Sequence, residues 1–235
     1  MRARTLLFAG LATFIGIGLI GCDPEKMAGE EPVKKTSVTK SAPPPEPYDV
    51  SLLKTVPSDG DTVGVFETSM GRIVFMFYPE IAPTHVEHFK KLISEGFYDG
   101  TRFHRCMPGF MIQGGDPNSK DLSKSVTWGQ GGYVVDGVEQ NIQAEFNLLP
   151  HTKGVMSTAR SPQGPDTASS QFFIMHQENR NLDYQYTAWG RVVQGLDVVD
   201  KIVSTGPTDQ ALKGAVPPSK AVVLKKATLD TWPLK

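Results

Sequence analysis

Short apolar runs, separated by glycine, proline, asparagine and aspartate, fill the chain from about residue 61 to its end. Runs that are rich in β-branched and aromatic residues and bounded by turn residues are typical of strands. We therefore predict strands over residues 63–67, 72–78, 101–105, 110–113, 154–158, 171–175, 186–192 and 221–229. The step Ser69-Met70-Gly71 between the first two runs predicts a hairpin turn.

Two segments have apolar residues at helical spacing instead. The first begins with Pro83, which suits a first helical turn, and stops at Gly96. The second covers residues 196–203. Many short strands with only two helices, and no alternation of strand and helix, predict a mainly β domain whose antiparallel strands close into a barrel. The last run, residues 221–229, would return to the sheet and close it.

The first 21 residues follow a different pattern. Arg2 and Arg4 precede an apolar run over residues 6–20, which is shorter than the ~20 residues of a spanning helix and contains glycines. This layout is typical of a secretory signal peptide. Its end, LIGC at residues 19–22, resembles the lipobox of bacterial lipoproteins, which implies cleavage before Cys22 and acylation of Cys22, with palmitate as a typical chain. Plain secretion and an uncleaved membrane anchor are the alternatives.

Residues 22–60 contain lysine, glutamate, serine, threonine and proline but almost nothing that a core could bury. Such a composition is typical of a disordered tether. We thus predict a signal peptide over residues 1–21, a tether over 22–60 and one folded domain over 61–235. A flexible coil of this length spans about 30–35 Å, so a lipidated chain would keep its domain near a membrane of the bacterial cell envelope, facing the periplasm or the exterior.

Charge and cysteine content narrow the functional classes. A formal net charge of −1 gives no basis for binding nucleic acid. Besides Cys22 the chain has only Cys106, which we expect to be a small buried apolar residue. His85 and His88 are three residues apart, but no third ligand is placed by spacing, so we expect solvated histidines and no metal site.

Common catalytic motifs are missing from the sequence. There is no G-x-S-x-G, H-E-x-x-H or phosphate-binding loop, and the one G-x-G-x-x-G, at residues 16–21, falls in the N-terminal apolar run and follows no predicted strand. No spacing of serine, histidine and acidic residues suggests a nucleophile with its base, so a hydrolase is not supported, and no cofactor is expected.

One cation stands among apolar residues in FHRCMPGFMIQGGD, residues 103–116. A guanidinium in such surroundings needs a partner or a ligand, and Arg105 has no nearby acid before Asp116. Alternation predicts that Phe103 and Arg105 share one face. In SSQFFIM, Gln171 and Phe173 would share a face in the same way, whereas Phe172 would lie in the core.

Arginine, glutamine and aromatic side chains can bind an extended peptide. Rotation about a peptide bond is a reaction that needs few groups beyond these. Rotation about a peptide bond has a barrier of ~18–20 kcal/mol because the nitrogen lone pair is delocalised into the carbonyl. A group that stabilises the twisted amide lowers this barrier without a covalent step.

Together with FYDGTRFHR before it and GVMSTAR, SSQFFIM and LDYQYTAWGRVVQGLDVVDKI after it, this stretch resembles the cyclophilin family of peptidyl-prolyl cis–trans isomerases. The resemblance runs from about residue 61 to the end. It implies an eight-stranded antiparallel barrel capped by two α-helices and a monomer without a cofactor. Its substrates would be Xaa–Pro bonds in proline-containing peptides or unfolded chains that are exported or close to the membrane. A proline-binding module or chaperone with little turnover is the alternative.

The resemblance also implies the site. Arg105 would be the catalytic arginine that donates a hydrogen bond to the prolyl nitrogen, with Gln113 and Phe110 beside it. His104 is expected to be a structural histidine with its hydrogen bonds satisfied. The implied substrate-binding residues are Met111, Ala159, Arg160, Gln171, Phe173, Leu182 and Tyr186.

Three positions depart from eukaryotic members of that family. Asn181 replaces the tryptophan that contacts cyclosporin, so strong cyclosporin sensitivity is not expected. Tyr186 replaces a pocket histidine, and its ring and hydroxyl can still line a proline site. Arg160 replaces an asparagine, and this second cation would favour acidic residues near the substrate proline.

Overall fold

The computed structural model describes residues 48–235. The predicted signal peptide, Cys22 and residues 23–47 of the predicted tether lie outside the described residues. Within residues 48–235, no helix has both the length and the apolar character needed to cross a membrane.

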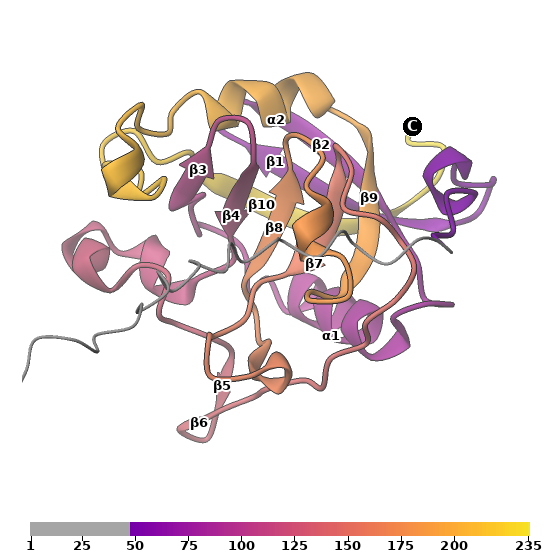
Figure 1. The fold of residues 1–235 in the computed structure, drawn as a ribbon, viewed down its shortest axis with the longest axis horizontal. Coiled ribbons are helices and arrows are strands. Elements are labelled where there is room, and N and C mark those ends of the chain that lie inside the picture. Colours follow the sequence, from indigo (N-terminus) through magenta and orange to yellow (C-terminus); the bar gives the residue numbers. More distant parts are fainter. Residues whose placement is uncertain (1–47) are drawn as a thin grey trace, which may run out of the picture. The chain divides into compact units, whose positions relative to one another are not determined.

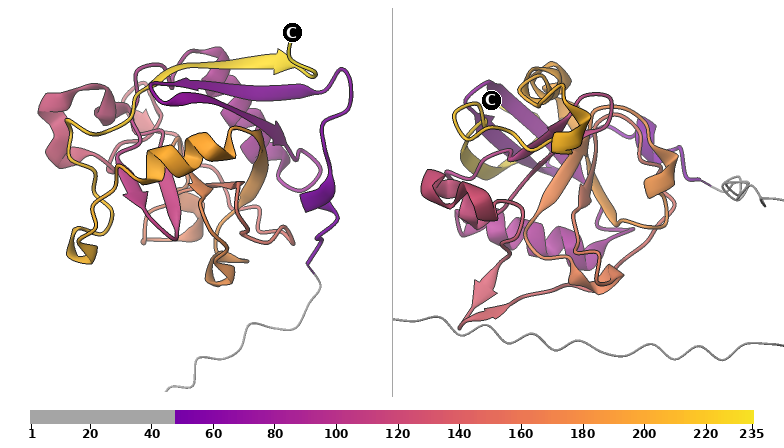
Figure 2. Two further views of the ribbon diagram at one scale, coloured as in Figure 1. Left: turned by 90° about the horizontal axis from the view of Figure 1, so that it is seen from above. Right: turned by 60° about the vertical axis from the view of Figure 1, so that its left-hand side comes forward.

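Eight strands form one antiparallel sheet that curls into a barrel (Figure 1). The strands are β1 (Thr62–Thr68), β2 (Gly71–Phe77), β3 (Arg105–Met107), β4 (Met111–Gly114), β7 (Val155–Thr158), β8 (Phe172–Met175), β9 (Ala188–Gln194) and β10 (Leu224–Thr231). Their order in the sheet is β10-β1-β2-β9-β7-β8-β4-β3. A separate hairpin, β5 (Val134–Val135) and β6 (Val138–Glu139), projects from the body of the domain (Figure 2).

The barrel closes through an irregular seam between β3 and β10. A single bridge joins Arg102 to Val223, with the Phe103 amide donating to Val222 O at 3.0 Å. Of the strand expected over residues 101–105, only Arg105 lies in a regular strand, because the chain before it pairs with this seam. The predicted mainly β, eight-stranded barrel with two helices is confirmed.

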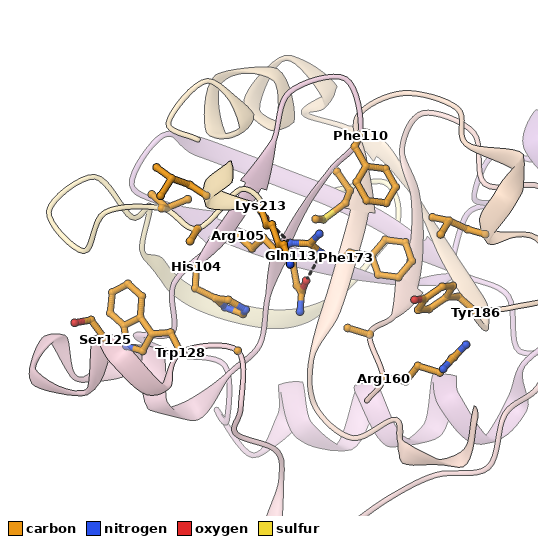
Figure 3. Close-up of a pocket in the computed structure, with 17 residues that line it drawn as sticks. His104, Arg105, Phe110, Gln113, Ser125, Trp128, Arg160, Phe173, Tyr186 and Lys213 are labelled. Carbon is orange, nitrogen blue, oxygen red and sulfur yellow. Dashed lines mark hydrogen bonds between the residues drawn. The ribbon is translucent and has the colours of Figure 1, made fainter. Parts of the chain in front are cut away.

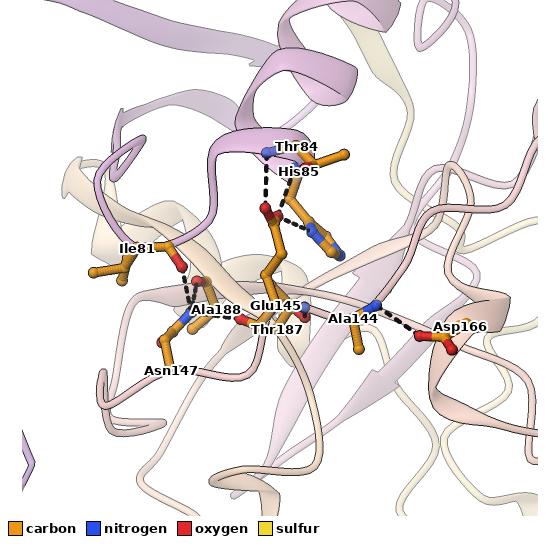
Figure 4. A network of polar contacts seen from close by, with 9 residues as sticks. All are labelled: Ile81, Thr84, His85, Ala144, Glu145, Asn147, Asp166, Thr187 and Ala188. Atoms are coloured by element: carbon orange, nitrogen blue, oxygen red, sulfur yellow. Dashed lines mark hydrogen bonds and ion pairs between the residues drawn. The ribbon is translucent and has the colours of Figure 1, made fainter.

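The two helices lie on opposite sides of the barrel, α1 (Pro83–Ser94) on one and α2 (Leu196–Val203) on the other (Figure 1). The residue before α1 is Ala82, which has no side chain able to cap the free amides of the first turn. Glu145 from a distant loop does this instead and accepts hydrogen bonds from the Thr84 and His85 amides, both at 2.9 Å (Figure 4).

The same carboxylate contradicts the expectation of solvated histidines on α1. His85 is fully buried, and its Nδ1 lies 2.6 Å from Glu145 Oε2. Burial lowers the pKa of His85 below its ordinary value, although Glu145 opposes this shift. The expectation was wrong because a partner 60 residues away cannot be read from the spacing within one helix. Within residues 48–235 no group of three or more His, Cys, Asp or Glu side chains could hold a metal ion.

The buried apolar residues form two main clusters. The first fills the barrel between the helices, where Phe89 and Trp189 stack with ring centroids 4.2 Å apart. Phe172 and Cys106 are fully buried there, as expected, and burial raises the pKa of the Cys106 thiol to about 12. The second cluster lies toward β4, β7 and β8 and contains Met76, Tyr78, Met111, Leu149, Val155, Phe173, Met175 and Ala188.

Residues 48–57, which we call the N-terminal strap, lie against the domain. The Asp49 amide donates to Leu148 O at 3.1 Å, and the Tyr78 hydroxyl donates to Leu52 O at 2.7 Å. The sequence predicts a disordered tether as far as residue 60, and the structure differs from residue 48 onward. The apolar residues of this segment follow neither a helical nor a strand period, and the residues that hold the strap come from distant parts of the chain.

Candidate functional site

A cavity of about 520 Å³ opens over β3, β4 and β8 (Figure 3). The structure brings all the predicted catalytic and substrate-binding residues together here or in an adjoining hollow of about 460 Å³, which shares Gln113, Gly129, Ala159 and Arg160 with the cavity. Of the predicted residues, Gln171 is the one that lines the adjoining hollow but not the cavity. The predicted residues that line the cavity itself are Arg105, Phe110, Met111, Gln113, Ala159, Arg160, Phe173, Leu182 and Tyr186.

Strand register places the polar centre of the cavity beside its aromatic wall. Arg105 on β3 is paired with Gln113 on β4, and Gln113 is paired with Phe173 on β8. Directly paired residues of antiparallel strands lie on the same face, so these three form one row across the sheet. Phe103, which was expected on the face of Arg105, packs in the barrel core instead. It precedes β3, so strict alternation does not connect it with Arg105.

Neutral acceptors orient the guanidinium of Arg105. Its Nε donates to Lys213 O at 2.9 Å, its Nη1 donates to Gln113 Oε1 at 3.2 Å, and its Nη2 lies 3.0 Å from Met107 Sδ. Among residues 48–235 no carboxylate forms an ion pair with it. Burial lowers the pKa of Arg105 from its ordinary value, but an arginine in a protein stays protonated. The cavity therefore holds a fixed and uncompensated positive charge.

Gln113 in turn is held from its other side. Its Nε2 donates to Gln171 Oε1 at 2.9 Å, and Gln171 Nε2 donates to Gly131 O at 2.8 Å. This chain of amide groups fixes which end of Gln113 faces Arg105, because the oxygen is the only acceptor on the side chain.

An apolar wall stands next to the cation (Figure 3). The rings of Phe173 and Tyr186 meet edge to face with centroids 5.5 Å apart. Phe110, Met111 and Leu182 pack against the same cluster. The arrangement offers a compact apolar ligand a place beside one hydrogen-bond donor of fixed direction.

Arg160 lies at the rim, with its guanidinium 4.8 Å from the centroid of the Tyr186 ring and its Nε donating to Gln185 O at 3.0 Å. Such stacking is a usual cation–π arrangement. It leaves Arg160 in contact with both the cavity and the adjoining hollow.

Eight lining residues were not predicted as part of the site: His104, Ser125, Trp128, Gly129, Leu212, Lys213, Ala215 and Val216. Trp128 is a partly exposed tryptophan in a glycine-rich polar loop, which is a signal that the sequence offered. The backbone carbonyl of Lys213 accepts a hydrogen bond from Arg105, and such a contact cannot be predicted from a pattern of side chains.

His104 differs from its expected role. It is buried, yet neither ring nitrogen has a hydrogen-bond partner among the described residues, so it is not a satisfied structural histidine. Burial lowers its pKa to about 4, against the attraction of Asp116 for the charged form. The neutral ring lines the cavity on the side opposite Phe173 (Figure 3).

Beneath Phe173 lies an arrangement that the sequence did not indicate. Ser157 Oγ is 2.9 Å from His151 Nε2, and His151 Nδ1 is 2.8 Å from Asp183 Oδ1. This connectivity is that of a hydrolytic triad. Ser157 is completely buried and His151 is 1% exposed, however, so no substrate reaches the hydroxyl. The network is structural, and the ring of His151 stacks on Phe173 with centroids 6.0 Å apart.

Comparison with known proteins gives one consistent match. The family model for cyclophilin type peptidyl-prolyl cis-trans isomerase/CLD matches residues 63–229. A probable peptidyl-prolyl cis-trans isomerase of Brucella abortus is 37% identical over 74% of this chain and 85% of its own length. A peptidyl-prolyl cis-trans isomerase of Arabidopsis thaliana is 35% identical over 71% of this chain and 95% of its own length. A Cryptosporidium parvum cyclophilin type isomerase, crystallised in the presence of the dipeptide Ala-Pro, is 26% identical with a TM-score of 0.61, covering 72% of this chain and 99% of that one.

Proposed function

The chain belongs to the cyclophilin-type peptidyl-prolyl cis–trans isomerases and is an enzyme of that class, and from this premise we propose that it catalyses through the cavity around Arg105. The observation that carries the proposal is the unpaired guanidinium, held by neutral acceptors next to an apolar wall. The substrate is an Xaa–Pro bond in a peptide or an unfolded chain.

The geometry suggests how the barrier is lowered. The proline ring packs against Phe110, Met111 and Phe173, with Leu182 and Tyr186 at the side. As the amide twists, its nitrogen regains a lone pair and becomes an acceptor for the Arg105 guanidinium. This interaction is stronger in the twisted state than in the planar one, so it accelerates rotation instead of merely tightening binding. No covalent bond forms or breaks.

The Cryptosporidium parvum relative supports a proline peptide as the occupant, since it was crystallised in the presence of Ala-Pro. Arg160, at the rim, would favour an acidic residue near that proline. Asn181 lies in the turn that carries Leu182, and its short amide offers little surface to cyclosporin.

The setting of the enzyme is part of the proposal. Acylation of Cys22 would anchor the chain to a membrane of the bacterial cell envelope, with a tether over residues 22–47 and the domain acting as a monomer on exported chains. Because residues 48–57 lie against the domain, the tether would be shorter than the 22–60 segment that composition suggests.

The role of Arg105 is tested by NMR exchange or a protease-coupled assay on a short Xaa–Pro peptide. We expect Arg105→Ala to lower kcat/KM by at least about 100-fold, a loss of ~2.7 kcal/mol in transition-state stabilisation. Arg105→Lys keeps the charge but not the planar fork that reaches all three acceptors, so its activity should also fall.

Two outcomes would contradict the proposal. If the wild-type protein does not accelerate isomerisation, the alternative of a proline-binding module remains. NMR titration with the same peptide would then still detect binding. A large residual rate in Arg105→Ala would show that the guanidinium is not needed for catalysis, although the protein would still be an isomerase.

The anchor is tested separately, by expressing Cys22→Ala in a bacterial host that processes lipoproteins. We expect the wild-type chain in the membrane fraction and the variant released from it. Membrane association that is unchanged in Cys22→Ala would contradict lipidation.

A further inference from the structure

The N-terminal strap ends on the turn that forms one side of the cavity. The ring centroid of Tyr48 lies 3.7 Å from Cζ of Arg180 and 6.0 Å from the ring centroid of Tyr184. These two residues flank Leu182, whose side chain lines the cavity. Tyr48 therefore contacts both ends of a short segment whose middle forms part of the pocket wall.

A continuous polar path leads from Tyr48 to the aromatic wall. Arg180 forms an ion pair with Asp183, with Nε 2.8 Å from Oδ2, and Asp183 Oδ1 accepts a hydrogen bond from the His151 amide at 2.8 Å. The ring of His151 stacks on Phe173. Burial alone would raise the pKa of Asp183, but the hydrogen bonds from His151 and the charge of Arg180 outweigh it and lower this pKa. The carboxylate is thus charged and fixes both partners.

An apolar path runs in parallel. Leu52 and Leu53 of the strap pack against the second core cluster, which contains Met111 and Phe173. The Tyr78 hydroxyl, which donates to Leu52 O, accepts from Arg191 Nε at 3.2 Å. The strap therefore packs on the cluster that supports the cavity.

We propose that the N-terminal strap is a positioning element of the isomerase site, with Tyr48 acting through Arg180 and Asp183 on Leu182 and Phe173. The inference rests on the proposed function of the cavity. Its consequence is that the segment that joins the tether to the domain also sets the width of the proline pocket. A force applied to the tether, or a partner bound to it, would then change the affinity of the cavity for its substrate.

The test uses the full chain and the variants Tyr48→Ala and Tyr48→Phe. We expect Tyr48→Ala to raise KM three- to tenfold with a small change in kcat, because the pocket wall loses its support while Arg105 keeps its contacts. Tyr48→Phe keeps the ring over Arg180 but loses the hydrogen bond between the two side chains, so its KM should lie between those of the wild type and Tyr48→Ala. Val56→Ala is the matched control, since Val56 belongs to the strap but is 70% exposed.

A second readout separates positioning from stability. NMR spectra are recorded at a temperature far below the unfolding midpoint. We expect the methyl resonances of Leu182 and Met175 to shift in Tyr48→Ala and to keep their wild-type positions in Val56→Ala. If Tyr48→Ala does not fold, Tyr48→Leu replaces it, since leucine fills space but lacks the π face, and the same rise in KM is expected.

A fall in Tm with unchanged KM and unchanged methyl resonances would overturn the inference and leave the strap a purely structural segment. In that case the wild-type protein would still accelerate isomerisation. A wild-type protein without activity would overturn the proposed function and this inference together.

Discussion

At the scale of single residues, the site depends on a cation whose partners are all neutral. A carboxylate at the same distance would compensate the charge, but Lys213 O, Gln113 Oε1 and Met107 Sδ orient the guanidinium and leave it free to act on a ligand. In the sequence, Arg105 has no acid near it before Asp116, and among residues 48–235 no carboxylate forms an ion pair with it.

Among residues 48–235, Gln113 supplies the side-chain oxygen that accepts a hydrogen bond from Arg105. We expect Gln113→Leu to lower kcat/KM by about 10- to 100-fold, because Arg105 Nη1 loses its acceptor and Gln171 loses its donor, and each tenfold corresponds to ~1.4 kcal/mol. Gln113→Glu should also be impaired at neutral pH, since its carboxylate would pair with Arg105, and should recover as the pH falls and the carboxyl is protonated.

These variants are measured by NMR exchange on one Xaa–Pro peptide over a range of pH. Gln194→Leu is the matched control, because Gln194 is an exposed residue of β9 away from the cavity. Activity of Gln113→Leu within twofold of the wild type would show that Arg105 is positioned without it.

At the scale of elements, the segments with clear periodicity were predicted well. The runs over 63–67 and 72–78 became β1 and β2, and both helices lie where apolar spacing put them, because burial of one face explains each pattern. The hairpin of β5 and β6 was missed although the sequence carries a signal. Asp136 and Gly137 stand between valines, and both adopt positive φ, 50° and 79°, as a tight hairpin turn requires.

Other features had no local signal. The cap of α1 by Glu145, the Lys213 carbonyl at Arg105 and the strap all depend on residues that meet only in the folded chain. The same holds for the network of Ser157, His151 and Asp183. Nine residues of the cavity could be predicted from a family resemblance, whereas the contacts that hold them could not, because these contacts join distant segments of the chain.

At the scale of the whole molecule, buried ionisable groups make stability depend on pH. Burial lowers the pKa of His85 and lowers that of His104 to about 4. The unfolded chain binds a proton at each of these rings near pH 6.5, so acid favours the unfolded state. This contribution to stability is complete above pH 6.5 and is lost as the pH falls toward the folded-state pKa. The pKa of Asp183 is lowered, so its contribution to the stability of the fold is lost at a lower pH, below about 4.

His104 offers the sharpest test of this dependence, since it is only 6% exposed and has a folded-state pKa of about 4. Between pH 7.5 and pH 4.5 we expect it to account for a loss of roughly 2–3 kcal/mol in the free energy of unfolding. Urea unfolding of the wild type and of His104→Gln at the two pH values should therefore differ in their acid-induced losses by about this amount, whatever the variant's stability at pH 7.5. NMR titration of the folded wild type should place the His104 ring transition near pH 4. Equal acid-induced losses in the two proteins, or a ring that titrates near pH 6.5, would show that the imidazolium is accommodated beside Asp116 in the folded state.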